Sequence, residues 1–190
     1  MIPKIESLVA SLDELEADVA CITETWLTGE HEKICQDVCD RTDYGLIIKN
    51  RTERKGGGVG IIYNKSHLTM TQCKLPASDY EIVAAIGRRT RQRRKVLAIA
   101  AYLPPKYSAE ENKNFLSYLC DAILTLKHKY SDPYVIVAGD FNKRNLSEAT
   151  KDYQDIKQVK TPPTRGTAVL DIIATNMTDN LIEAGVTDPV

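Results

Sequence analysis

Apolar positions along the chain follow two periods, which predict helices alternating with strands. Near the N-terminus the spacing is three or four residues and predicts an amphipathic helix over residues 3–17; its apolar positions are Ile5, Leu8, Leu12 and Leu15. The same spacing predicts a longer helix over residues 108–130, with one face formed by Phe115, Leu119, Ile123 and Leu126. Residues 30–40 are expected to form a short helix or a loop.

Continuous apolar runs predict buried strands between these helices. They lie at residues 19–22, 44–49, 59–63, 80–87, 96–102 and 134–140, and a last strand surrounds Asp171. The runs at 80–87 and 96–102 are expected to pair as a hairpin. Alternating strands and helices favour an α/β class of layered structure. Since no internal repeat or linker divides the sequence, we expect one domain over residues 1–190.

Composition narrows the class of protein further. Hydrophobic residues make up 43% of the chain and charged residues 27%, which argues against a disordered protein. No apolar run approaches the roughly 20 residues of a membrane span. Acidic residues interrupt the N-terminal segment, so we expect neither a membrane partner nor a signal peptide. The five cysteines form no Cys-x-x-Cys pair, which suits a reducing, intracellular compartment.

His31, Cys35 and Cys39 stand four residues apart and share a face if this segment is helical. The pattern is typical of buried thiols on an amphipathic helix, and a metal site is the alternative. The formal net charge of −1 gives the whole molecule no general attraction for nucleic acid. Any such attraction would have to be local.

Polar side chains stand at the ends of several predicted strands. Asp140 and Asn142 follow an apolar run and are two residues apart, so in extended geometry they point the same way. A carboxylate and an amide in this place suit a phosphate and a hard metal ion, and a turn rich in Asp and Asn is the alternative. Glu24 and Tyr102 end two other runs, and Asp171 interrupts a fourth. Polar groups delivered by several strands are typical of a site built on a rigid scaffold.

Five segments in order resemble the endonuclease/exonuclease/phosphatase family, and within it the apurinic/apyrimidinic-type endonuclease domains of non-LTR retrotransposons. They are Cys21-Ile22-Thr23-Glu24-Thr25-Trp26-Leu27, Lys55-Gly56-Gly57-Gly58-Val59-Gly60-Ile61, Ala101-Tyr102-Leu103-Pro104-Pro105, Gly139-Asp140-Phe141-Asn142 and Leu170-Asp171-Ile172-Ile173-Ala174-Thr175-Asn176. The resemblance covers nearly the whole chain. It implies a four-layer sandwich of two packed, mainly antiparallel or mixed sheets flanked by helices.

The resemblance also implies roles for these residues. Glu24 would bind a divalent metal, Mg²⁺ or Mn²⁺, beside the scissile phosphate. Asp140 would orient or deprotonate the attacking water, and Asn142 would hold that water or a phosphate oxygen. Tyr102 would place its phenol near the phosphate, as a donor or as a phenolate; the alternative is an aromatic ring that caps the core. Asp171 would orient a histidine.

Thr164 and Asn176 are the less specific candidates for contact with the phosphate or DNA. Thr164 matches a hydroxyl that donates to phosphate in related domains, and Asn176 has a simple turn as its alternative. The basic run over residues 88–95 includes Arg91, Arg93 and Arg94. It predicts either a solvated hairpin tip or a loop that contacts DNA phosphates.

The family's histidine belongs to a Ser-Asp-His motif after the Asp171 strand, and none of His31, His67 and His128 has a matching context. The family's first strand is also not recognisable before the first helix. We therefore expect a domain truncated at both ends and inactive, or nearly so, without the catalytic histidine.

The expected function is a metal-dependent endonuclease that nicks DNA, as part of a longer polyprotein with a reverse transcriptase that acts inside the cell, in the nucleus. A phosphoesterase acting on a small phosphorylated substrate is the first alternative, because fold does not decide substrate. An inactive nucleic-acid-binding remnant is the second.

Overall fold

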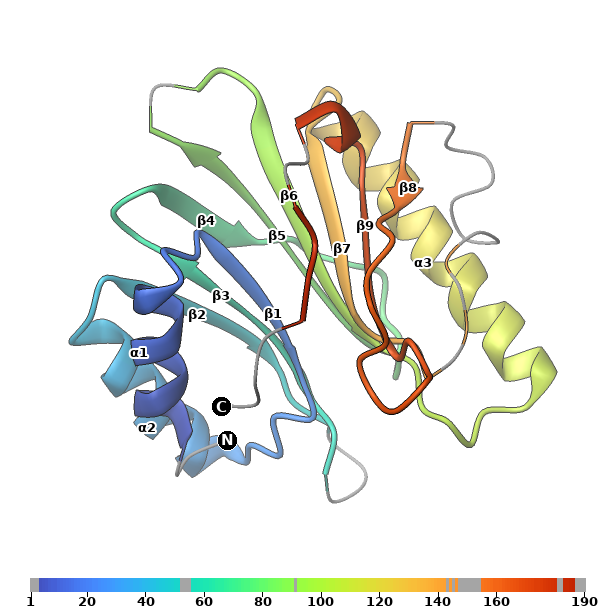
Figure 1. Ribbon diagram of the computed structural model, residues 1–190, viewed down its shortest axis with the longest axis horizontal. Coiled ribbons are helices and arrows are strands. Elements are labelled where there is room, and N and C mark those ends of the chain that lie inside the picture. The colour runs from blue at the N-terminus through green and yellow to red at the C-terminus, as the bar shows by residue number, and fades with distance from the viewer. Residues whose placement is uncertain are drawn as a thin grey trace.

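Two sheets pack face to face and helices cover their outer faces (Figure 1). The computed structural model describes residues 4–51, 56–90, 92–142, 144, 146, 155–180 and 183–186. The smaller sheet has the order β1-β3-β2, with both neighbours antiparallel. The larger sheet has the order β4-β5-β6-β7-β9-β8, in which β6 and β7 are parallel and the other pairs antiparallel. The expected α/β sandwich of two sheets flanked by helices is confirmed.

The element bounds are close to those expected from periodicity. The helices are α1 (Ile5–Glu14), α2 (Gly29–Asp40) and α3 (Ala109–Lys129), and a 3-10 turn follows at η2 (Thr178–Asn180). The smaller sheet contains β1 (Val19–Thr23), β2 (Tyr44–Lys49) and β3 (Val59–Asn64). The larger contains β4 (Leu68–Gln72), β5 (Glu81–Arg89), β6 (Lys95–Tyr102), β7 (Tyr134–Asp140), β8 (Lys157–Gln158) and β9 (Asp171–Thr175). The short strands β4 and β8 were not predicted.

Helix α3 connects the parallel strands β6 and β7 and packs on the outer face of their sheet (Figure 1). Its start is fixed by a capping box, in which Ser108 and Glu111 exchange side-chain and backbone hydrogen bonds. The predicted apolar face is confirmed, because its members Phe115, Leu119, Ile123 and Leu126 are all buried. This crossover places the ends of β6 and β7 at the same edge of the sheet.

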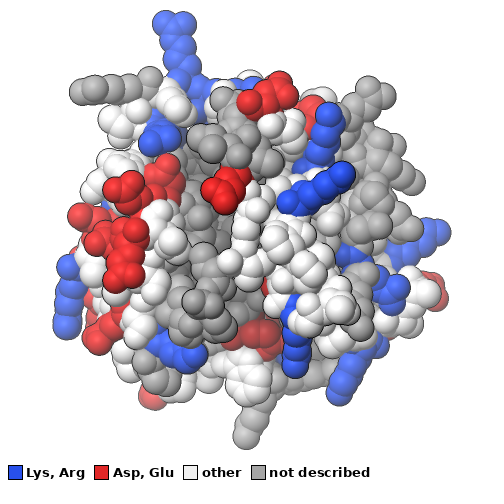
Figure 2. Space-filling view, in the orientation of Figure 1, with Lys and Arg blue, Asp and Glu red and all other residues white. Residues whose placement is uncertain are grey.

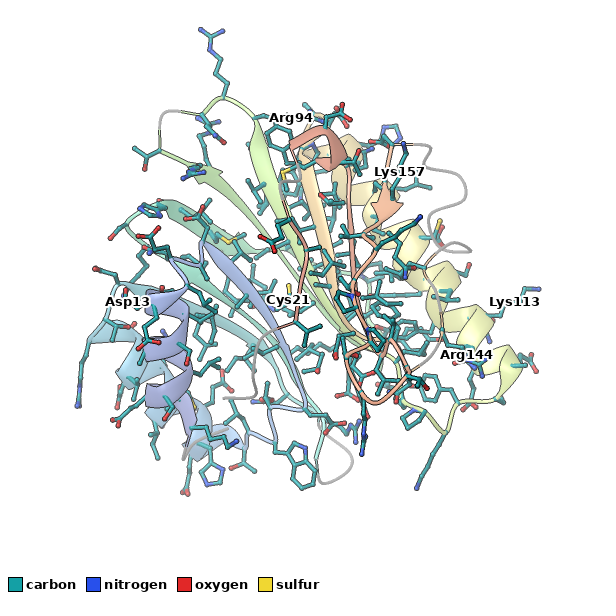
Figure 3. All side chains as sticks on the ribbon, in the orientation of Figure 1. Asp13, Cys21, Arg94, Lys113, Arg144 and Lys157 are labelled. Carbon is teal, nitrogen blue, oxygen red and sulfur yellow. The ribbon has the colours of Figure 1, made fainter. Side chains whose placement is uncertain are left out.

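Three apolar layers hold the four structural layers together. One lies between α3 and the larger sheet, a second between the two sheets, and a third between the smaller sheet and helices α1 and α2. Cys35 and Cys39 belong to the third and are fully buried, as an amphipathic helix with core thiols predicts. Cys21 lies between the sheets, where its Sγ is 3.8 Å from the Ile99 carbonyl oxygen (Figure 3).

Two expectations about the strand around Asp171 are wrong. The strand begins at Asp171, so the residue lies at the start of the strand instead of inside it. Its side chain is exposed, whereas the sequence predicts burial. Val169 and Leu170 before it lie between the strand and a turn in which Arg165 and Ala168 form an isolated bridge. Within the part of the chain that the structure describes, no helix is both long and apolar enough to span a membrane.

Candidate active site

The ends of strands from both sheets meet at one edge of the molecule, at the bottom of Figure 1. Tyr102 and Asp140 end the parallel strands β6 and β7, and Asp171 begins β9 directly opposite Asp140. Glu24 follows β1 of the smaller sheet and accepts a hydrogen bond from the Tyr102 hydroxyl. This bond joins the two sheets at the same edge. The structure therefore brings together four of the candidate residues.

Glu24 is held by a network of donors. Its Oε2 accepts hydrogen bonds from Trp26 Nε1 at 2.6 Å and from the Gly57 backbone N–H at 3.0 Å. Burial raises the pKa of Glu24, but the bonds from Tyr102, Gly57 and Trp26 and the charge of Arg51 outweigh it and leave the pKa below its ordinary value. The carboxylate is therefore ionised at neutral pH, as a metal ligand must be.

Tyr102 is buried, with 8% of its surface exposed. Burial raises the pKa of its phenol strongly, and the neighbouring carboxylates of Glu24, Asp140 and Glu81 raise it further. Of the two forms expected from the sequence, the structure thus favours the neutral phenol, which donates to Glu24.

Asp140 ends strand β7, but Asn142 is not extended, so the expected extended geometry of the pair does not hold. Asn142 has a φ of 46°, and its backbone N–H donates to Asp140 Oδ1 at 2.9 Å. This is the turn rich in Asp and Asn that the sequence left open as the alternative. The Asn142 Nδ2 donates to the Leu103 carbonyl oxygen at 3.0 Å. The turn still keeps both side chains at the active edge, because Leu103 directly follows Tyr102.

The pKa of Asp140 is raised. Burial is the largest cause, and the charges of Asp171 and Glu24 add to it, against the hydrogen bond from Asn142 and the charge of Arg165. A carboxylate with a raised pKa is a better proton acceptor when ionised, which suits a general base.

Gly139 sets the spacing between β6 and β7 beside Asp140. Its φ of 150° is unfavourable for other residues. A Cβ at this position would lie 1.8 Å from the Ala101 backbone oxygen. Only glycine therefore fits where these two strands bring Tyr102 and Asp140 together.

Thr164 lies beside Asp171. Its Oγ1 accepts from the backbone N–H groups of Leu170 at 2.9 Å and of Asp171 at 3.3 Å. Both bonds use the hydroxyl oxygen as acceptor, which leaves the hydroxyl hydrogen able to donate to a phosphate.

Sequence reasoning missed an ion pair at this edge, between Arg51 and Glu81. Arg51 Nε donates to Glu81 Oε1 at 2.9 Å, and its Nη2 forms a second, shorter bond. Glu81 is buried, pairs in register with Tyr102 and also accepts from the Gly58 backbone N–H. The pair therefore supports the glycine turn that holds Glu24. No sequence pattern joins these two residues, because Arg51 follows β2 of the smaller sheet and Glu81 begins β5 of the larger one.

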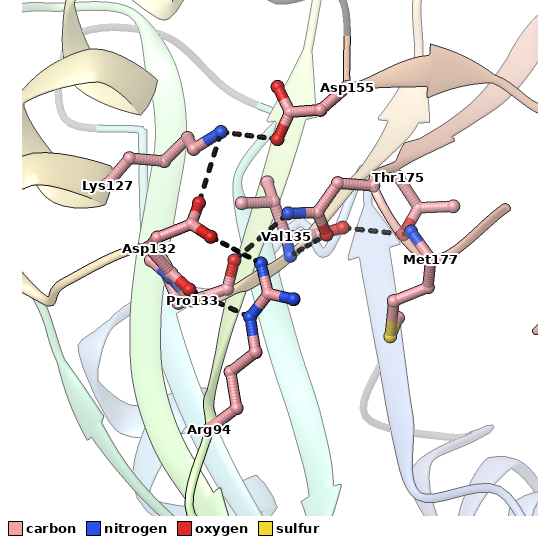
Figure 4. A network of polar contacts seen from close by, with 9 residues as sticks. Arg94, Lys127, Asp132, Pro133, Val135, Asp155, Thr175 and Met177 are labelled. Atoms are coloured by element: carbon pink, nitrogen blue, oxygen red, sulfur yellow. Dashed lines mark hydrogen bonds and ion pairs between the residues drawn. The ribbon is translucent and has the colours of Figure 1, made fainter. Parts of the chain in front are cut away.

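Asn176 and Arg94 lie at the end of the larger sheet opposite the candidate site. Figure 4 shows Arg94 bonded to Asp132 in this region. The Asn176 side chain accepts from the Val135 backbone N–H at 2.8 Å and donates to the Pro133 carbonyl oxygen at 3.1 Å. The structure thus gives Asn176 a structural contact and does not bring it to the candidate site.

The basic hairpin tip is also remote from the candidate site. Arg94 donates to Asp132 Oδ2 at 2.7 Å and lies over the Tyr134 ring, while Arg93 is exposed. From Lys95 to Tyr102 the strand spans seven residue steps, or roughly 23 Å. The solvated tip is favoured over a loop beside the scissile bond. Arg91 lies outside the described residues, and so does Lys55.

The donor set at the active edge fits a hard divalent cation held by few protein ligands. Among the described residues no three His, Cys, Asp or Glu side chains are close enough to hold a metal ion together. Mg²⁺ does not need such a cage, because it binds through one or two carboxylates with water and substrate oxygens. The ionised Glu24 carboxylate is the ligand the structure offers.

Comparisons with known proteins identify the fold. No family model matches the sequence, and no curated protein matches it. The human Nocturnin catalytic domain with bound sulfate is similar at 14% identity, over 92% of this chain and 74% of that one, with a TM-score of 0.68. An endonuclease/exonuclease/phosphatase from Bacteroides vulgatus is similar at 12% identity, over 90% and 78%, with a TM-score of 0.66. The endonuclease domain of TRAS1, a telomere-specific non-LTR retrotransposon, is similar at 13% identity, over 92% and 81%, with a TM-score of 0.64. At these identities the likeness establishes a shared fold.

Proposed function

We propose that this chain, which has the endonuclease/exonuclease/phosphatase fold, is a divalent-metal-dependent phosphodiester hydrolase that nicks DNA. The observation that carries the proposal is the meeting of Glu24, Tyr102, Asp140 and Asp171 at one edge of two packed sheets. Glu24 is an ionised ligand, Tyr102 is a neutral donor, and Asp140 is a carboxylate of raised pKa. Phosphodiester hydrolysis needs a group in each of these states.

Each side chain has a role that follows from its state. Glu24 would hold Mg²⁺ or Mn²⁺, which when bound neutralises developing charge on the phosphate oxygens. Tyr102 donates its one hydroxyl hydrogen to Glu24 and so would hold this ligand in place beside the phosphate. Asp140 accepts the proton of the attacking water, and Asn142 and Thr164 hold phosphate oxygens or the water. Asp171, beside Asp140, keeps the pKa of that base high.

The charge distribution favours an approach of DNA along the active edge. Acidic side chains gather over α1 and α2, at the left of Figure 2. They include Glu6, Asp13, Glu14, Glu30, Glu32, Asp37 and Asp40. A polyanion is repelled by this layer. At the active edge, Arg51, Thr164 and Arg165 offer donors to phosphate.

The likeness to the TRAS1 endonuclease domain supports a DNA substrate and a retrotransposon setting. In that setting the chain would be part of one polyprotein with a reverse transcriptase, and it would act in the nucleus. The phosphoesterase alternative differs from this proposal in its substrate, which would be a small phosphorylated molecule instead of DNA.

The test uses supercoiled plasmid with 5 mM Mg²⁺ (about the concentration such assays use), with and without EDTA. The sequence alone predicts little or no activity without the family's histidine, whereas the proposal assigns the chemistry to the four side chains that meet at this edge. On the proposal we expect Mg²⁺-dependent conversion to open circles, lost at least about 100-fold in Glu24→Gln. Glu14→Gln, an exposed carboxylate on α1, is the matched control and should keep wild-type nicking. Hydrolysis of p-nitrophenyl phosphate without nicking would support the small-substrate alternative. No Mg²⁺-dependent activity on either substrate would contradict the proposal.

A second readout is independent of turnover. If Glu24 holds the cation, millimolar Mg²⁺ should raise the melting temperature of the wild type and leave that of Glu24→Gln unchanged. An equal rise in both proteins would remove Glu24 as the ligand.

A further inference from the structure

Trp26 is the only tryptophan of the chain, and 64% of its surface is exposed. Large aromatic side chains are mostly buried, so an exposed indole beside a candidate active site needs an explanation. We propose that Trp26 is a stacking platform for an unpaired nucleobase next to the scissile phosphate. This inference rests on the proposed phosphodiester hydrolase function and specifies its substrate as DNA that is single-stranded or locally unpaired.

The indole is fixed in place by its own chain. Trp26 has a φ of 53°, and its backbone N–H donates to the Gly57 carbonyl oxygen at 2.8 Å. Its ring nitrogen donates to Glu24 Oε2 at 2.6 Å. A Cβ added to Gly56 would lie 3.3 Å from the indole Cε2, so the Gly56 backbone lies close to the ring. A ring held by these contacts loses little conformational freedom when a ligand stacks on it.

The exposed part of Trp26 is carbon surface. The only polar atom of an indole is its N–H, and here that group is bonded to Glu24. What remains accessible is a π surface of the kind on which nucleobases stack in proteins that bind single strands. Sugar phosphates and inositol phosphates have no flat π face and gain nothing comparable. The side chain therefore distinguishes substrates that carry bases from those that do not.

The position of the ring fits a base adjoining the reacting phosphate. Trp26 and the proposed metal share the Glu24 carboxylate, so a base on the indole belongs to a nucleotide at the scissile bond. Inside a duplex both faces of a base are covered by its neighbours. The platform consequently requires a base that has left the stack, as in a single strand, a frayed end or a distorted site.

Because Trp26 is the sole tryptophan, intrinsic fluorescence reports directly on it. The experiment titrates the protein in EDTA, which prevents metal-dependent turnover, with single-stranded dT12 and with a 12-mer of abasic sites carrying the same phosphates. We expect dT12 to quench the fluorescence and to bind roughly 5- to 100-fold more tightly than the abasic strand. Equal affinity and no quenching by dT12 would overturn the proposal.

Variants are compared by the fluorescence anisotropy of labelled dT12, since substitutions of Trp26 remove the intrinsic fluorophore. Trp26→Leu should bind dT12 roughly 5- to 100-fold more weakly and the abasic strand as the wild type does. Trp26→Phe keeps a π face without the ring nitrogen and should recover most of the dT12 affinity. Leu15→Ala, an exposed apolar residue at the end of α1, is the control and should leave both affinities unchanged.

The outcomes separate this inference from the proposed function. Base-dependent binding through Trp26 without any plasmid nicking supports the platform and contradicts the hydrolase. Nicking that persists while Trp26→Leu binds dT12 as the wild type does supports the hydrolase and overturns the platform. Melting curves of each variant check that the fold is intact.

Discussion

Asp140 and Asp171 are register partners at the end of the antiparallel pair β7–β9, one ending its strand and the other beginning it. Side chains of directly opposite residues point to the same face and lie close together. Burial raises the pKa of Asp140 most, and the Asp171 charge raises it further. The second carboxylate therefore tunes the first.

Asp171→Asn should move the acid limb of the pH–rate profile to lower pH. Removing the neighbouring negative charge lowers the pKa of Asp140, so the base is ionised at a lower pH than in the wild type. The measurement is nicking rate from pH 5 to pH 9, normalised to the maximum of each protein. Asp121→Asn on α3 serves as the control. An acid limb that does not move would mean that the two carboxylates do not interact.

Asp140→Asn should stabilise the protein near neutral pH while it lowers activity. The folded-state pKa of Asp140 is raised, so the wild type loses stability as pH rises through that pKa. The amide removes this loss, and we expect a gain of about 2–4 °C in melting temperature at pH 7.5, shrinking as pH falls toward about 4. Nicking should fall at least about 100-fold. A lower melting temperature of Asp140→Asn than of the wild type at pH 7.5 would show that burial of the Asp140 carboxylate does not destabilise the folded protein.

Tyr102→Phe should weaken both the fold and the site. The phenol donates to Glu24, and its loss should cost about 1 kcal/mol in the free energy of unfolding. Without that donor the pKa of Glu24 rises toward its ordinary value, so more Mg²⁺ is needed for half-maximal nicking at pH 5.5 than in the wild type. Tyr118→Phe, which removes a hydroxyl that donates to Pro76, is the control for loss of a hydrogen bond elsewhere. An unchanged Mg²⁺ requirement would show that Tyr102 does not act on Glu24.

Arg51→Met should be more destabilising than the double change Arg51→Met with Glu81→Gln. The single change leaves the buried Glu81 carboxylate without its cation, at a cost of about 3 kcal/mol. In the double variant the amide is neutral and its oxygen can still accept from the Gly58 N–H. Denaturant unfolding measures both.

Arg89→Met, which breaks an exposed ion pair with Asp18, provides the scale for that comparison and should cost under about 1 kcal/mol. A double variant at positions 51 and 81 that is less stable than Arg51→Met would show that the charge of Glu81 is not what makes the pair necessary.

Local sequence patterns predicted most of the helices and strands. The features that were not predicted depend on how strands pair in the folded protein. Helix α3 could be predicted from periodicity because its apolar face and its Ser108 cap act within one segment. Strand β4 also alternates, with Leu68 and Met70 buried, but Thr69, Thr71 and Gln72 leave it no continuous apolar run, and it was missed. Strand β8 has two residues and exists only by pairing with β9, so no local pattern predicts it.

The candidate site shows the same division. Glu24, Tyr102 and Asp140 could be placed at strand ends from the sequence alone. The exposure of Asp171 could not, because it depends on where β9 begins opposite β7. The Arg51–Glu81 pair requires two sheets to be packed before it exists. The remoteness of the basic tip follows from the hairpin itself, since Arg94 directly precedes β6 and Tyr102 ends it.

The contact between Gly139 and the Ala101 carbonyl oxygen makes the site vulnerable to a substitution that changes no chemical group in it. A single added methyl at residue 139 would meet a backbone atom 1.8 Å away and force β6 and β7 apart where Tyr102 and Asp140 end their strands. Every acid, phenol and amide of the site would survive such an allele, and only their spacing would be lost. A survey of sequence variants that inspects the polar residues alone would count that allele as intact.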